Sequence, residues 1–314
     1  MACGENPKRT YGERKQQPMT RMGNLALQRE AFLNARRLIG EWDRWRAAEK
    51  LRAERHADAV AETQTKRLHR KRKTQECAEG VPDSEQCAEW ERVWHDAPLT
   101  DPVPSVAELP PKRDLDLETL AGVLEGRVLA HVHCYRADDM ANMIALADET
   151  GFRIRTFEHA LEAYKIRDRL ARRKIAVVTW ADWWGFKMEA YDGIPENLAL
   201  VTAAGGRAML HSDSHEGIRR LNQEAAKGMV SGRQAGVEIS EATAIGWVTS
   251  NPAWALGVDQ RVGSLAVGKD ADVVVWDGSP FSVYSRAERV FIDGVERYNL
   301  HQRSKPWSDF EAAP

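Results

Sequence analysis

Four side chains that can bind a divalent metal fall at the ends of predicted strands in the second half of this chain. They are His131, His133, His159 and Asp213. Imidazole nitrogen and carboxylate oxygen are ligand types that suit zinc and similar ions. A single histidine on a strand is more often a hydrogen-bonded core residue, but four such groups at equivalent positions favour a metal site. The sequence therefore predicts a divalent-metal site, with zinc as the first choice.

Asp213 is the residue that we expect to act as the general base. A bound divalent ion lowers the pKa of its water to about 7, and a nearby carboxylate can take the proton as hydroxide attacks a carbonyl. His211 and His215 flank Asp213 in the run LHSDSH. We expect one of them to be structural, and each is a candidate for contact with a substrate or with a metal ligand.

The elements that must position these residues alternate between short apolar strands and helices from residue 114 onward. Strands are predicted in RVLAHVH, RIRTFEH, IAVVTWAD and GRAMLHSD, and a helical segment follows each. This alternation predicts parallel βα units, whose active sites lie at the carboxy ends of the strands. Because His131 and His133 are two residues apart, both side chains should lie on the same face of their strand. A complete barrel has eight such units, and four are visible here.

The first 113 residues have a different character. Residues 24–75 are rich in Arg, Lys, Glu, Ala and Gln, with apolar residues at helical spacing, which predicts one long helix or two. Residues 76–113 are dense in proline, which predicts an irregular loop. The basic block KRLHRKRK at 66–73 could contact phosphate, but we favour the alternative that it is a solvated helix face.

The composition is that of a folded protein and gives no global attraction to nucleic acid. The chain is 43% hydrophobic and 29% charged, and 45 basic against 47 acidic residues give a net charge of -2. It contains no apolar run as long as a membrane span or a signal peptide, so we expect a cytoplasmic protein as the sequence is written. Its cysteines are widely spaced without a CxxC motif, so we expect neither a disulfide framework nor a cysteine zinc site.

Several motifs together resemble the amidohydrolase superfamily, in particular its imidazolonepropionase-like and prolidase-like branch. They are HVHCYRADDM, TFEHALEAYKI, LHSDSHEGIRRLNQEAAKGM and the run from TSNPAWALG to FIDG. The opening segments GENPKR and TRMG resemble the part of that branch that follows the fourth barrel strand. The run near the carboxy terminus is the most specific, because NPA, GSLAVGKDAD and a closing IDG rarely occur together.

The resemblance implies an α/β fold, a (β/α)8 TIM-like barrel with a small β-sandwich. It implies hydrolysis of a carbon–nitrogen bond, with one or two metal ions, in a small-molecule amide, cyclic amide or dipeptide-like substrate. Strand 5 would supply a histidine ligand, for which His131 is the first choice and His133 the second. Strand 6 would supply His159, and strand 8 would supply Asp213.

Two residues just beyond the strand 5 histidines, Tyr135 and Arg136, are candidates for holding a substrate carboxylate. A guanidinium group matches a carboxylate as a bidentate donor. A surface ion pair is the alternative for Arg136.

The sequence departs from the family pattern on its amino-terminal side. The family has an HxH on strand 1 and, in this branch, usually a carboxylated lysine on strand 4, whereas the HxH found here belongs to strand 5. We therefore expect a truncated protein with a partial barrel of strands 5 to 8 and a remnant of the sandwich, in which the apolar face of residues 265–276 is poorly covered. We also expect at most one weak metal site and little or no activity from this chain alone.

Two alternatives remain open. In the first, the chain is a non-catalytic or assembly-dependent fragment, completed by a homo-oligomer or by a complementing amino-terminal half. In the second, it binds nucleic acid through residues 66–73. If a missing amino-terminal part carried a signal peptide, the protein would be periplasmic or secreted.

The predicted organisation has four parts. They are a helical, charged segment with a proline-rich loop (1–113), the second half of a hydrolase barrel (114–257), part of a composite β-sandwich (258–300) and a tail (301–314).

Overall fold

The structure is a computed structural model of the 314-residue chain, and it describes residues 1–80, 82–94, 100 and 102–302. Most of the predicted tail from residue 301 lies outside the described residues. Contacts divide the chain into two compact units. One comprises Met1–Leu33 and Thr119–Pro314, and the other comprises Asn34–Glu118.

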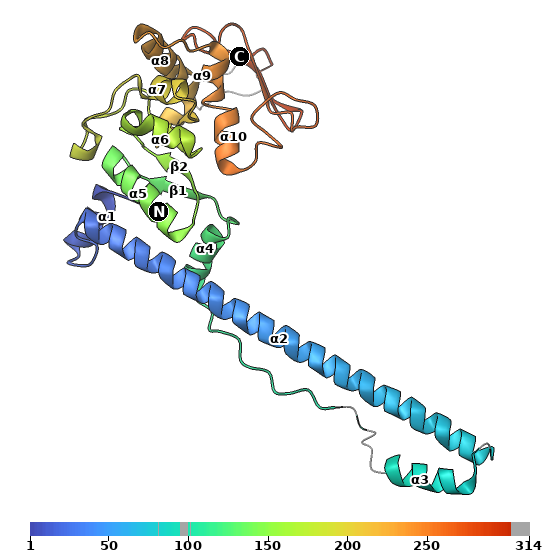
Figure 1. Cartoon of the computed structure of the whole chain (residues 1–314). Helices are drawn as coiled ribbons and strands as arrows, with labels where there is room; N and C mark the ends of the chain where they lie inside the picture. The colour runs from blue at the N-terminus through green and yellow to red at the C-terminus, as the bar shows by residue number, and fades with distance from the viewer. Residues whose placement is uncertain (81, 95–99, 101, 303–314) are drawn as a thin grey trace, which may run out of the picture. The chain divides into compact units, whose positions relative to one another are not determined.

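A four-stranded parallel sheet forms the centre of the first unit (Figure 1). The strands lie in sequential order, β1-β2-β3-β4, and each is followed by a helix, as the alternating pattern predicts. The strands are β1 (Ala130–His133), β2 (Ile154–Glu158), β3 (Ala176–Thr179) and β4 (Ala208–Leu210). The helices that follow them are α5 (Ala137–Thr150), α6 (Arg167–Arg172), α7 (Asn197–Ala203) and α8 (Leu221–Gln234). Helices α9 (Glu241–Gly246) and α10 (Ser250–Leu256) complete this part.

The two faces of the parallel sheet have different chemistry because side chains alternate along a strand. On one face, Val132, Phe157 and Val177 are fully buried in the main core, which includes Met140 of α5 and Leu198 of α7. Burying an apolar side chain of this size contributes about 1.5–3 kcal/mol. The opposite face carries His131 and His133 on β1, Thr156 and Glu158 on β2, and small or apolar residues on β3 and β4. The latter are Ala176, Val178 and Met209, which pack with Ala255 of α10.

The first residues of the chain lie beside β1. Ala2 forms an isolated parallel bridge with His133, whose backbone N–H donates to Met1 O at 3.0 Å and whose carbonyl accepts from Cys3 N at 2.7 Å. Helix α1 (Glu5–Glu13) follows directly. The start of α2 also packs in this unit, where Phe32 stacks on Phe152 with 4.3 Å between ring centroids.

Helix α2 (Arg21–Ala78) is a single helix of 58 residues, so the predicted helical segment forms one helix and not two. Residues 76–113 differ from the expected irregular loop, because α3 (Ser84–Trp94) lies within them. Residues 102–114 have no regular secondary structure, and α4 (Leu115–Leu124) follows.

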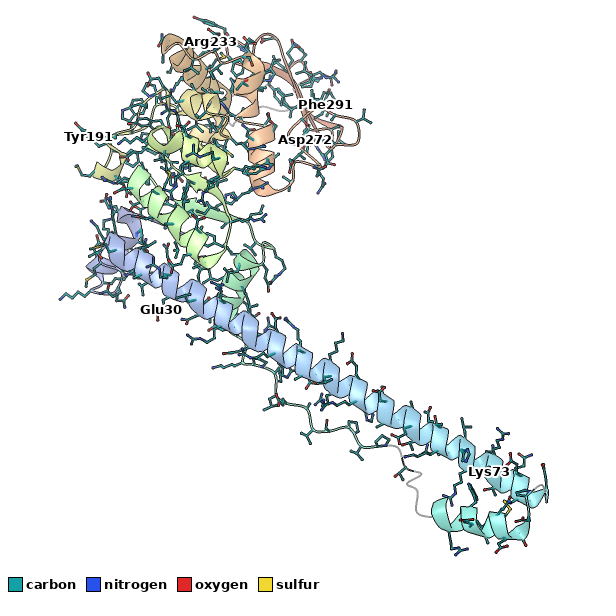
Figure 2. All side chains as sticks on the ribbon, viewed as in Figure 1. Glu30, Lys73, Tyr191, Arg233, Asp272 and Phe291 are labelled. Carbon is teal, nitrogen blue, oxygen red and sulfur yellow. A yellow bond between two sulfur atoms is a disulfide. The ribbon has the colours of Figure 1, made fainter. Side chains whose placement is uncertain are left out.

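A disulfide joins Cys77 in the last turn of α2 to Cys87 in α3, a pairing that the wide spacing of the cysteines did not suggest (Figure 2). The sequence separation of ten residues is compatible with a helix, a tight turn and a second helix. The spacing alone does not reveal that the two helices bring these cysteines together.

The small sheet near the carboxy terminus is antiparallel, in the order β5-β6-β7. Its strands are β5 (Val273–Trp276), β6 (Ala287–Ile292) and β7 (Val295–Asn299). Leu265, Val267, Val274 and Val275 are exposed, so the apolar surface of residues 265–276 is poorly covered, as predicted. Within the described residues, no helix combines the length and the hydropathy needed to span a membrane.

Candidate active site

Three histidines converge at the carboxy ends of the parallel strands. His133 ends β1, His159 follows β2 and His211 follows β4. The ring centroids of His133 and His159 are 4.4 Å apart, and those of His159 and His211 are 4.8 Å apart. Because parallel strands end at a common edge, residues from three strands meet although 78 positions separate His133 from His211. We call these three residues the histidine cluster.

The backbone at the strand ends adopts an uncommon conformation. His159 has φ of 66° and Asp213 has φ of 46°, in the left-handed region that residues with a Cβ rarely occupy. Non-glycine residues held there cost about 1–3 kcal/mol, and such residues cluster at active sites and ligand clamps. Two predicted site residues therefore share this signature.

All three imidazoles of the histidine cluster favour the neutral form. Burial, reinforced by His211 and His133, lowers the pKa of His159 to about 2. Burial also lowers the pKa of His133, with a further contribution from the ammonium of Lys187, and burial lowers the pKa of His211. A neutral imidazole is the form that binds a metal ion.

Two ring nitrogens of the histidine cluster are buried without a hydrogen-bond partner. They are His159 Nδ1 and His211 Nε2. A buried polar atom without a partner costs about 1–3 kcal/mol, so each position fits a ligand that accepts a nitrogen lone pair or a proton. Yet the described part of the chain contains no group of three or more His, Cys, Asp or Glu residues arranged to hold a metal ion. The fit to a divalent metal is therefore partial.

His131, the first choice for the strand ligand, lies outside the histidine cluster and has other partners. Its Nδ1 lies 2.9 Å from Glu158 Oε1, and its Nε2 lies 3.1 Å from the carbonyl oxygen of Ala255. His131 and His133 lie on one face of β1, as predicted. They are two positions apart, which is about 7 Å along the strand. Only His133, at the carboxy end, reaches His159.

The His131–Glu158 pair is electrostatically complementary. The hydrogen bond to Glu158 raises the pKa of His131. Burial alone raises the pKa of Glu158, but its hydrogen bonds with His131 and Thr156 outweigh that effect and leave this pKa lowered. Both partners of the His131 ring are acceptors, so the doubly protonated imidazolium satisfies both. No local pattern predicts this role of Glu158, which directly precedes His159.

A second set of contacts orients His133 from outside the strands. Asn6 Nδ2 of α1 lies 3.2 Å from His133 Nε2, and Asn6 Oδ1 accepts from Lys187 Nζ at 3.1 Å. Lys187 Nζ also lies 3.9 Å from the ring centroid of Tyr135 and 2.7 Å from the buried carboxylate of Glu189. Asn6, Lys187 and Glu189 were missed because none lies at the end of a predicted strand.

Asp213 lies on the exposed loop after β4. Its negative charge raises the pKa of His211 and of His133, in each case against the larger effect of burial. The carboxylate is therefore close enough to the histidine cluster to act on it electrostatically. His215, two residues further on, is exposed.

The two predicted substrate contacts beyond β1 have different environments. Tyr135 is buried and stacks on His159, with 5.1 Å between centroids and 17° between planes. Burial, together with the charges of Glu189 and Asp213, raises the pKa of Tyr135, so its hydroxyl remains a donor at neutral pH. Arg136 pairs with Asp138 at 2.9 Å, which corresponds to the surface ion pair considered as its alternative.

The chain is similar to known amidohydrolases. Residues 165–298 match the family model Amidohydro_3, described as the amidohydrolase family. The chain is similar to amidohydrolase tasK of Hapsidospora irregularis, with 31% identity over 304 residues that cover 95% of this chain and 25% of that protein. It also resembles the crystal structure of an amidohydrolase from Thermotoga maritima MSB8, with 32% identity and a TM-score of 0.67. That match covers 95% of this chain and 62% of the other, so this chain spans only part of both relatives.

Proposed function

We propose that this chain, which matches the amidohydrolase family model over residues 165–298, carries part of a metal-dependent site that hydrolyses a carbon–nitrogen bond. The proposed substrate is a small-molecule amide, cyclic amide or dipeptide-like compound, as in the imidazolonepropionase-like and prolidase-like branch. The observation that carries the proposal is the pair of buried, unpartnered nitrogens, His159 Nδ1 and His211 Nε2, at the carboxy ends of parallel strands.

In this proposal the parallel sheet corresponds to strands 5 to 8 of a (β/α)8 barrel. The sequential order of β1 to β4 supports it. The small antiparallel sheet would be part of a β-sandwich. The proposed boundaries remain 1–113 for the helical, charged segment, 114–257 for the half barrel and 258–300 for the sandwich part.

The histidine cluster would hold the ion, with His133 replacing His131 as the ligand from strand 5. When bound, a divalent metal such as zinc acidifies a water molecule and polarises a carbonyl group. Asp213 would accept the proton from the attacking water as general base. The protonated hydroxyl of Tyr135 would donate to a substrate oxygen, and the exposed His215 would contact the substrate from the same loop as Asp213.

We expect weak metal affinity and low activity from this chain alone. Affinity grows with the number of ligands that are held in place before binding. The histidine cluster offers two unpartnered nitrogens, and the third imidazole, His133, already contacts Asn6 at 3.2 Å. A single, weakly held ion is therefore the most that we propose here.

A second candidate function is a domain that becomes active only when another polypeptide completes it. The exposed apolar side chains of Leu265, Val267 and Val274 favour this candidate, because surfaces of this kind commonly mark protein interaction sites. The polypeptide that completes it would be a second copy of the chain or a complementing amino-terminal half.

Nucleic-acid binding through residues 66–73 has less support. Three cations of that block already pair with glutamates on the same helix: Lys66 with Glu62, and Arg72 and Lys73 with Glu76. These contacts are typical of a solvated helix face.

Turnover of a panel of dipeptides, N-acyl amino acids and cyclic amides with added zinc tests the proposed function. We expect low turnover that Asp213→Ala reduces by about a hundredfold, the lower range for loss of a general base. Glu216→Ala, an exposed carboxylate on the same loop, should leave the rate unchanged and is the matched control. Equal rates in all three proteins would contradict the role of Asp213, and the absence of turnover would favour the assembly-dependent candidate.

A further inference from the structure

An aromatic segment lies beside the histidine cluster, between β3 and α7. Trp180 stacks on His159, with 4.9 Å between centroids and 18° between planes, and lies 4.5 Å from the ring of His211. Its indole N–H donates to the carbonyl of Ser212 at 3.0 Å, which fixes the ring. Trp180 is therefore a buried ring that borders the histidine cluster.

Two further rings continue from Trp180 toward the protein surface. Trp183 lies 5.0 Å from Trp180, and Phe186 lies 5.9 Å from Trp180 and 5.1 Å from Trp183. Whereas Trp180 is 5% exposed, Trp183 is 44% exposed and Phe186 is 46% exposed. A continuous path of ring contacts thus runs from the histidine cluster to a solvent-exposed aromatic surface. Large adjoining aromatic surfaces left open to water commonly mark binding sites.

The segment that carries these rings is held in place before any ligand binds. Gly185 N donates to the carbonyl of Ala190 at 2.8 Å, and Lys187 is tied to both Glu189 and Asn6. A Cβ at Gly193 would lie 2.5 Å from Cβ of Trp184, so glycine is needed there for the segment to close. Tyr191 projects from the end of the segment (Figure 2). A rigid surface loses little entropy on binding, which favours recognition of a small rigid group.

The charges beside the rings restrict what can bind. Lys187 Nζ lies 3.9 Å from the centroid of Tyr135 and 5.7 Å from that of Phe186. This ammonium group already lies over the face of Tyr135, and its ion pair with Glu189 at 2.7 Å leaves little net charge beside the rings. The aromatic surface is therefore suited to a neutral group with a planar face.

We infer that Trp183 and Phe186 determine specificity, and that the substrate carries a neutral aromatic group adjacent to the scissile carbon–nitrogen bond. This inference rests on the proposed function, because it takes the histidine cluster as the reacting end of the site. The aromatic group of the substrate stacks against Trp183 and Phe186, while its amide lies toward Trp180 and His159.

Binding measured without turnover tests the inference. Ligand-observed NMR titrations would compare N-phenylacetylglycine with N-acetylglycine on the full chain, with EDTA present so that metal chemistry plays no part. We expect the aromatic compound to bind at least about tenfold more tightly. Trp183→Ala and Phe186→Ala should each reduce that preference to about threefold or less, whereas Trp183→Phe should retain most of it. Tyr284→Ala, which removes an exposed aromatic ring outside the segment, is the control.

Equal affinity for the two compounds would overturn the inference, as would no detectable binding of N-phenylacetylglycine up to about 10 mM. A preference that persists in both alanine variants would also overturn it. Because the titration needs neither metal nor turnover, its failure is distinct from the failure of the proposed hydrolase activity. That activity is tested separately through Asp213.

Discussion

His131 and His133 lie on the same face of β1 and have opposite electrostatic environments. The pKa of His131 is raised by its hydrogen bond to Glu158, whereas burial lowers the pKa of His133. The charged form of His131 and the neutral form of His133 are therefore favoured, and the neutral form is the one that binds a metal ion. Although they are only two positions apart on one strand, His131 forms an ion pair and His133 is a candidate metal ligand.

Replacing His131 by Gln tests its structural role through the pH dependence of stability. The raised pKa of His131 stabilises the fold below the ordinary histidine pKa, and this stability is lost as the pH rises through the raised value. The lowered pKa of Glu158 adds stability above the ordinary glutamate pKa, lost as the pH falls through the lowered value. The pair therefore contributes most between those two ordinary values.

We expect His131→Gln to reduce the free energy of unfolding by about 1–2 kcal/mol near pH 5.5, and by less near pH 9. Urea unfolding at both pH values measures this, with His215→Gln, an exposed histidine, as the control. An equal loss at both pH values would show that the ion pair is not the source of the stability.

The sequence could place His131 and His133 on one face of their strand, but it could not choose between them. The choice depends on Glu158 and on the carbonyl of Ala255, which are 27 and 124 positions from His131. The contact of Asn6 with His133 spans 127 positions, and that of Lys187 with Asn6 spans 181. Strand ends could be predicted from local patterns, whereas these partners depend on tertiary packing.

At the scale of elements, the parallel sheet follows from local pattern because buried strands are short apolar runs separated by helices. The sequential order β1-β2-β3-β4 agrees with that expectation. Helix α3 was missed because prolines on both sides of Ser84–Trp94 suggest an irregular segment. The pairing of Cys77 with Cys87 was missed for the same reason, since it depends on α3.

Reducing the Cys77–Cys87 disulfide should loosen α3. In the chain-entropy account, closing a loop of about ten residues contributes about 2–3 kcal/mol. We expect amide hydrogen exchange in Ser84–Trp94 to accelerate by at least about tenfold after reduction, and Cys87→Ser to reproduce the effect. Exchange in α5 of the first unit should stay constant. Unchanged protection of α3 in both cases would show that the disulfide does not hold this helix.

At the scale of the whole molecule, the candidate site is assembled from distant parts of the first unit. Its residues come from α1, from the ends of three strands and from the segment before α7, and the family match covers residues 165–298 of the chain. We propose that the histidine cluster is the metal site and that His131 lies outside it.

Cobalt(II) titration, followed by its visible absorption, tests this claim most directly when the chain is compared with His159→Ala, His211→Ala and His131→Gln. We expect the purified chain to contain substoichiometric metal by mass spectrometry and to bind added cobalt weakly. This binding should weaken by at least about tenfold in His159→Ala and His211→Ala, because each removes a preorganised ligand, and persist in His131→Gln. Cobalt binding that survives in His159→Ala and His211→Ala, or that disappears in His131→Gln, would contradict the account.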